Sequence, residues 1–183
     1  MRSFIVVSNH PFFGHLSDFS ERSEQVQIKQ LVSIGSIEAF DVLDDFNREA
    51  LAIEIDTSLP SERLVRVFEQ LREERGLPDV LRTDNGPEFL GEVFVSWCEE
   101  NGVMLDYIEP GKPNQNAFIE RFNRSYRNEV LNTWLFRDLD EVREITWAWM
   151  LEYNEERDHD GLGGLTPAEV LANARISTLE WST

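Results

Sequence analysis

Apolar and polar residues alternate along two short stretches near the end of the first quarter of the chain. In residues 40–44, and again in residues 51–56, apolar side chains fall at every second position, which is the period of a half-buried strand. The polar residues 45–48 between them suit a tight connection. This part of the sequence therefore predicts a β-hairpin.

A helical period follows the predicted hairpin. Leu64, Phe68 and Leu71 are spaced three and four residues apart, with charged residues between them. Gly76 stands where the C-terminal stop of a helix is expected. We expect an amphipathic helix over residues 58–75.

Strand and helix then alternate. Residues 80–83 predict a short strand that runs directly into the turn-forming residues 84–86, so Asp84 is expected at the C-terminal end of a strand. Residues 89–100 predict a helix, and residues 103–108 another strand. This alternation implies parallel strands joined by right-handed crossovers, hence an α/β fold.

The last third of the chain predicts mainly helices. A loop rich in proline and glycine at residues 109–114 precedes a long helix over 116–131, and a further helix is expected over 139–154. Residues 166–169 have the order of a capping box with proline at the first helical position, so a short terminal helix should begin there. Residues 1–38 contain apolar patches but no sustained period, and no element is predicted for them.

The composition fits one folded domain. With 183 residues, 41% of them hydrophobic, the chain can fill a single core. Cys98 is the only cysteine, so no internal disulfide can form and a reducing compartment is expected. No apolar run approaches the roughly 18 to 20 residues of a membrane span. We therefore expect a cytoplasmic protein with no membrane partner.

The net charge of −18 argues against a nucleic-acid partner, because a negative field repels DNA phosphates. Two features weaken that argument. Lys29 and Lys112 are the only lysines, and a local cluster of cations stands at Arg121, Arg124 and Arg127. Abundant carboxylates with scarce lysine resemble the proteins of salt-loving organisms, which gives the hypothesis of a halophilic source.

The halophile hypothesis predicts that stability rises with salt. At about 1 M salt the screening length falls to about 3 Å, so repulsion among the acidic side chains is largely removed. The midpoint of urea unfolding should increase steadily as KCl is raised toward that concentration. Maximal stability at low salt would rule the hypothesis out.

Two carboxylates stand in recognisable settings, Asp84 after a strand and Glu120 on a helix, with 35 residues between them. Carboxylates that lie close together repel unless a proton or a cation intervenes. Mg²⁺ takes oxygen ligands and keeps several waters, so a few carboxylates suffice, and a pair of such ions can serve phosphodiester chemistry. On a helical period Asn116, Arg124 and Arg127 share the face of Glu120, although Glu120 and Arg124 alone could be an ordinary surface pair.

From about residue 40 to residue 172 the chain resembles the catalytic core of insertion-sequence transposases of the IS3 type, in the retroviral integrase superfamily. Any one matching segment is weak, and all of them in this order are specific. The segments are residues 42–49, 82–89 and 110–123, then Tyr153, Asn154, Arg157, His159, Leu165, Thr166 and Pro167.

The resemblance implies a ribonuclease-H-like mixed sheet flanked by helices, Mg²⁺ or Mn²⁺ as cofactor, and strand transfer of DNA. Asp84 and Glu120 then correspond to the second and third metal ligands of an Asp, Asp, Glu triad. The DNA-binding residues expected from it are Lys112, Asn116, Arg124 and Arg127. Its partners would be transposon ends and target DNA, bound by a homo-oligomer, with the protein on the nucleoid when it holds DNA.

The first aspartate of the triad is the main departure. The resemblance implies an aspartate on the strand before the hairpin, and no match is found there. Asp18 is a doubtful candidate, with a loop aspartate as the plainer interpretation. The simplest hypothesis is a truncated or frame-altered copy in which the first strand is missing or altered and transfer is largely lost.

The sequence thus predicts a non-matching segment over residues 1–38, an integrase-type core over 39–172 and a tail over 173–183. The principal interpretation is the core of a transposase that transfers DNA strands, either active or inactivated by loss of the first aspartate. Two alternatives stay open: a non-catalytic remnant that binds transposon DNA or full-length transposase, and a metal-dependent nuclease of the same fold.

Overall fold

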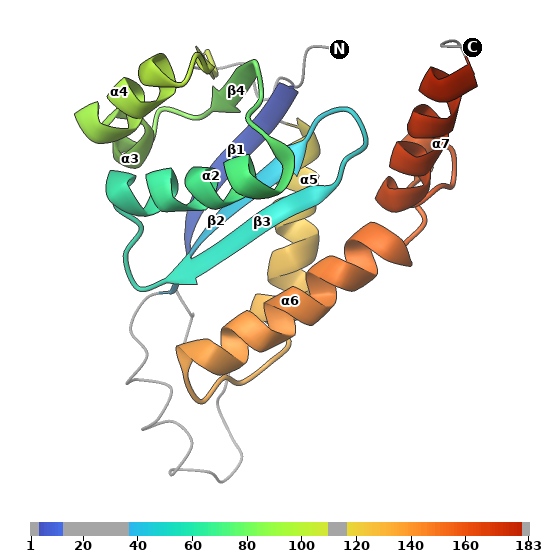
Figure 1. Cartoon of the computed structure of the whole chain (residues 1–183). Helices are drawn as coiled ribbons and strands as arrows, with labels where there is room; N and C mark the ends of the chain where they lie inside the picture. The colour runs from blue at the N-terminus through green and yellow to red at the C-terminus, as the bar shows by residue number, and fades with distance from the viewer. Residues whose placement is uncertain (1–3, 13–36, 110–116, 181–183) are drawn as a thin grey trace, which may run out of the picture.

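The computed structural model describes residues 4–12, 37–109 and 117–180 of the 183-residue chain. Five strands form one sheet in the order β3-β2-β1-β4-β5 (Figure 1). The strands are β1 (Phe4–Phe12), β2 (Ile37–Asp44), β3 (Ala50–Asp56), β4 (Val80–Thr83) and β5 (Met104–Tyr107).

Helices cover both faces of this sheet. They are α2 (Ser61–Arg75), α3 (Pro87–Leu90), α4 (Glu92–Glu100), α5 (Ala117–Tyr126), the π-helical turn η3 (Arg127–Leu131), α6 (Leu139–Glu155), the short η4 (Asp160–Leu162) and α7 (Pro167–Glu180). None of the helices in the described part of the chain is long and apolar enough to cross a membrane.

The predicted hairpin and parallel strands are confirmed. β2 and β3 pair antiparallel, and β4 pairs parallel with both β1 and β5. The helix predicted over 89–100 is divided instead into α3 and α4 at Gly91. A Cβ atom at Gly91 would collide with the Ser61 hydroxyl of α2, so glycine permits the close approach of these elements.

The expectation that the first strand might be missing is wrong, because β1 lies at the centre of the sheet. It pairs antiparallel with β2 over Ile5 to Phe12 and parallel with β4 over Phe4 to Val6. A central strand covered on both faces has no alternating pattern, which explains why the apolar run at its start gave no recognisable period.

The two faces of the sheet carry two separate cores. Alternate residues of β2 divide between them: Ala39 and Leu43 pack with α5 and α6, whereas Phe40 and Val42 pack with α2 and α4. The first core is rich in aromatic contacts from α5 to α6, and the second contains the Phe68, Phe89 and Phe94 cluster. The side of the sheet on which a residue falls therefore determines which helices it can meet.

Segments near the C-terminus that match the transposase pattern hold the outer helices to the hairpin. Asn154 of α6 accepts a hydrogen bond from Ala50 N at 2.8 Å and donates one to Ala50 O at 2.9 Å. Asn47 in the hairpin turn donates to Pro167 O at 3.2 Å. Thr166 N donates to Glu169 at 2.9 Å, which confirms the predicted capping box of α7. The hydrogen bonds of these residues stabilise the packing of α6 and α7 on the hairpin.

Candidate metal and DNA site

Asp84 follows directly after β4, as predicted from the sequence. Its carboxylate accepts a hydrogen bond of 2.9 Å from Gly86 N, which closes the turn and orients the side chain. The next residue, Asn85, donates to Ile108 O at 3.0 Å and ties the turn to the end of β5. Asp84 is half-buried, so the carboxylate is both fixed and reachable from solvent.

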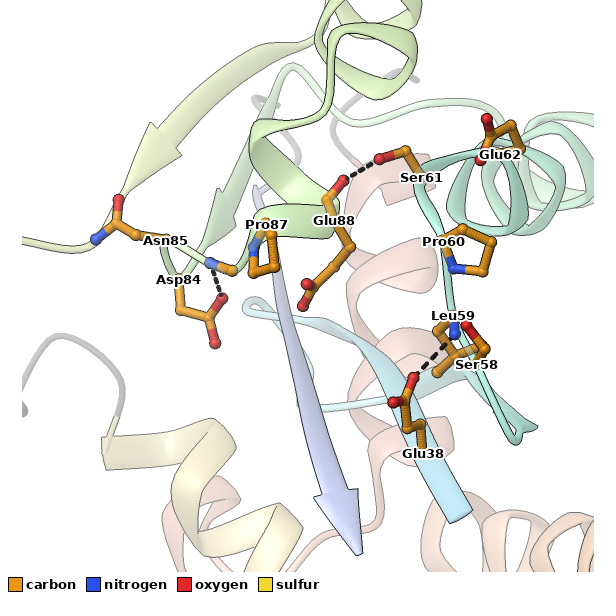
Figure 2. A pocket seen from close by; sticks show the side chains of 11 residues that line it. Glu38, Ser58, Leu59, Pro60, Ser61, Glu62, Asp84, Asn85, Pro87 and Glu88 are labelled. Atoms are coloured by element: carbon orange, nitrogen blue, oxygen red, sulfur yellow. Dashed lines mark hydrogen bonds between the residues drawn. The ribbon is translucent and has the colours of Figure 1, made fainter. Parts of the chain in front are cut away.

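A wide pocket of about 810 Å³ opens beside this turn (Figure 2). It lies between the start of β2, the start of α2 and the turn that carries Asp84. Glu38 and Glu88 reach into it from opposite sides, and Asp84 stands at its edge (Figure 2). The Glu38 carboxylate accepts a hydrogen bond of 2.9 Å from Leu59 N.

Neither Glu38 nor Glu88 was among the site residues predicted from the sequence. A signal existed for Glu88, which lies four residues after Asp84 in the same matching segment. No local signal marked Glu38, because only the pairing of β2 within the sheet brings it to this edge. Together these carboxylates make the pocket strongly acidic.

Glu120 lies in the first turn of α5 and is exposed. The direction in which Glu120 points from α5 follows from its neighbours, because Ile119 and Phe122 are buried in the core between α5, α6 and the sheet. Leu81 of β4 packs on the opposite face, with α2 and α4, so alternation places position 84 toward the α5 side. The fold thus assigns Asp84 and Glu120 to the same side of the sheet.

The described residues do not complete a two-ion site. No three Asp, Glu, His or Cys side chains among them lie close enough together to hold a metal ion. β1, the strand next to Asp84, reads Phe-Ile-Val-Val-Ser-Asn-His-Pro-Phe and contains no carboxylate. Asp18, the doubtful first ligand, lies outside the described residues. The carboxylates that are present therefore do not fit the pair of divalent ions that the fold family implies.

The arginines of α5 and η3 differ electrostatically from most others in the described part of the chain. Eight arginines there form ion pairs with carboxylates, for example Arg63 with Glu54 at 2.8 Å. Arg121, Arg124 and Arg127 have no such pair within the described residues. Arg121 and Arg124 are exposed, and Arg127 is half-buried. Two of the predicted DNA contacts, Lys112 and Asn116, lie outside the described residues.

The η3 turn at the C-terminal end of α5 is held by a separate network. Glu129 of η3 accepts hydrogen bonds from Trp149 Nε1 at 2.7 Å and from Arg157 at 3.0 and 2.6 Å. Burial opposes ionisation of Glu129, but the Arg157 and Trp149 hydrogen bonds prevail and lower its pKa. Arg157 belongs to the matching C-terminal segment, and its role here is to anchor η3 on α6.

Comparison with known proteins supports the resemblance. Integrase core domain models match residues 25–113 and 101–167. An uncharacterized 39.2 kDa protein of insertion element IS476 from Xanthomonas euvesicatoria is 39% identical over 145 residues, which is 79% of this chain and 42% of that protein. A protein of insertion element IS407 from Burkholderia multivorans is 40% identical over 77% of this chain and 51% of its own length. The chain thus spans about half the length of these relatives.

Solved structures establish the fold. The catalytic core domain of HTLV-2 integrase, solved in complex with magnesium, superposes with a TM-score of 0.61 at 16% identity, covering 90% of this chain and 94% of that one. The catalytic core domain of BIV integrase gives a TM-score of 0.63 at 14% identity over 95% of this chain and 97% of the other. These matches confirm the predicted ribonuclease-H-like fold. By its fold, its matched segments and its insertion-element relatives, the chain belongs to the integrase core family.

Proposed function

We propose that this chain acts in DNA transposition, as the core segment that holds DNA at the edge of the sheet where Asp84 and Glu120 lie. The observation that carries the proposal is the surface of α5 and η3, where Glu120 is followed by Arg121, Arg124 and Arg127 without carboxylate partners among the described residues. Guanidinium groups that are not neutralised within the protein can bind phosphates.

The strongly negative chain makes this local charge important. Most cations of the described part are already paired, so few remain to attract a duplex against a net charge of −18. Three of those that remain, Arg121, Arg124 and Arg127, lie on α5 and η3, and α5 also carries Glu120. DNA bound through them would pass close to the proposed metal ligand, which is the arrangement that a strand-transfer core requires.

The finer parts of the proposal follow from the family. Asp84 and Glu120 are the two ligands that the described part of the chain would supply to Mg²⁺ or Mn²⁺, and the metal would serve phosphodiester chemistry only with a further ligand. The DNA partners would be transposon ends and target, bound by a homo-oligomer in the cytoplasm and on the nucleoid. Lys112 and Asn116 would add contacts to the DNA.

A second candidate is a non-catalytic core that binds DNA or a full-length relative and interferes with transposition. The absence of a carboxylate in β1 favours it, because a two-ion site needs a group shared by both ions. The third candidate, a nuclease of the same fold, requires the same complete site and is disfavoured for the same reason.

One assay separates the three candidates. Purified chain is incubated with labelled duplexes that carry the terminal sequences of its own element, with Mg²⁺ or Mn²⁺ and a target plasmid. Joining of a 3′ end to the plasmid identifies a transposase, and cleavage without joining identifies a nuclease. Duplex binding with neither product is the expected result for the non-catalytic core. Failure to bind any duplex would contradict the DNA-holding function itself.

A further inference from the structure

The sheet brings three positions into one row on the α5 side. Ser8 of β1 is the partner of Asp41 on β2. On its other side β1 pairs with β4 through Val6 and Arg82, and the same register continued by two residues sets position 8 level with Asp84. Position 8 therefore stands between two aspartate-bearing positions on neighbouring strands.

The neighbours of Asp41 on β2 show on which face of the sheet Asp41 and position 8 lie. Ala39 and Leu43, two residues before and after it on β2, pack with α5 and α6. Asp41 itself is fully buried. Burial raises the pKa of the Tyr126 hydroxyl of α5, and the negative charge of Asp41 raises it further, which places Asp41 near that hydroxyl. Directly opposed residues of an antiparallel pair belong to the same face of a sheet. Position 8 thus belongs to the α5 face.

We infer that β1 completes the sheet but leaves the metal site incomplete, and that position 8 is the place where one carboxylate would complete it. This inference rests on the proposed function, since it names the missing ligand of the same site. A residue on β1 at the level of Asp84 and under α5 is the one placed to share an ion with both Asp84 and Glu120. Serine there supplies no charge.

The substitution Ser8→Asp tests the inference directly. We expect Mn²⁺ to bind the Ser8→Asp chain at least about tenfold more tightly than the unsubstituted chain in a calorimetric titration, because a further anionic oxygen ligand is added. Adding Asp84→Asn to Ser8→Asp should remove the gain. DNA is absent from this titration, so its result is independent of whether the chain binds duplexes.

Two matched variants control for charge and shape. Ser8→Asn adds nearly the same volume without charge, and it should leave Mn²⁺ affinity unchanged. Asn9→Asp adds the same charge one residue along the strand. Asn9 pairs with Phe40, which packs with α2 and α4, so position 9 belongs to the other face. The Asn9→Asp chain should therefore bind Mn²⁺ no better than the unsubstituted chain.

A stability measurement covers the case in which the new carboxylate perturbs folding. Ser8→Asp sets a carboxylate opposite Asp41, and like charges directly opposed on neighbouring strands destabilise a sheet. The melting temperature in EDTA should therefore fall below that of Ser8→Asn and recover when Mn²⁺ is added. Equal Mn²⁺ affinity of Ser8→Asp and Ser8→Asn, an equal gain in Asn9→Asp, or a Ser8→Asp chain that Mn²⁺ does not refold would each overturn the inference.

Discussion

Replacing Arg124 and Arg127 together by glutamine lowers the affinity of the chain for duplex DNA about a hundredfold, if each contributes about 1.5 kcal/mol as a charge-assisted contact to phosphate. Neither arginine pairs with a carboxylate in the described part of the chain, so their replacement breaks no ion pair of the folded protein. The loss should be large because the overall charge of −18 opposes binding and few cations compensate for it.

The chain offers a matched control for this prediction. Arg66 on α2 and Arg175 on α7 also have no ion pair among the described residues, and they lie on other helices. Arg66→Gln with Arg175→Gln changes the net charge by the same amount and should alter affinity by less than about threefold, since only the diffuse field changes.

Fluorescence anisotropy across a series of KCl concentrations measures both the affinity for duplex DNA and its dependence on salt. The slope of log affinity against log salt should decrease in magnitude by about two for the α5 pair, since two phosphate contacts are lost. It should stay unchanged for the control pair. Equal losses in the two double variants would show that net charge, and not the α5 surface, holds the DNA.

Phe122→Ala is the second large expected effect, a loss of about 3 to 5 kcal/mol in the free energy of unfolding. Phe122 is only 2% exposed and lies two residues from Glu120. Its ring meets Trp149 at 5.4 Å and Tyr153 at 5.0 Å between centroids, both edge to face. Truncation removes both contacts and leaves a cavity under the helix that presents Glu120.

An exposed aromatic residue on the partner helix serves as the control. Trp147 is 59% exposed, so Trp147→Ala should change stability by no more than about 0.5 kcal/mol. Urea unfolding followed by far-ultraviolet circular dichroism measures both variants under identical salt. A Phe122→Ala chain as stable as the Trp147→Ala chain would mean that α5 is not docked on α6 as described, and the placement of Glu120 would fail with it.

Local pattern predicted the elements whose apolar residues recur at a clear period. The hairpin shows the period of a strand although β2 packs on both faces of the sheet, and α2 shows its helical period because Leu64, Phe68 and Leu71 pack in one core. Asp84 was placed correctly at a strand end because its turn residues are themselves a local signal. These features depend on neighbours in sequence.

Features that depend on distant contacts could not be predicted in the same way. β1 is the central strand of the sheet and shows no period, and the break at Gly91 lies against Ser61, thirty residues upstream, whose hydroxyl donates to Glu88 O. The helix expected over 116–131 changes to a π-helical turn at Arg127, where Asn132 N donates to Arg127 O at 2.8 Å. Val130 and Leu131 of that turn are both buried.

The central position of β1 has a consequence for the fate of the protein in a cell. The hydrogen bonds that hold a strand between two others come from the backbone, so many sequences with enough apolar residues can occupy that place. Selection for a folded chain therefore does not maintain a carboxylate at position 8. A chain without that carboxylate can therefore lack the metal chemistry and still keep its folded sheet, so loss of function would not by itself expose it to degradation.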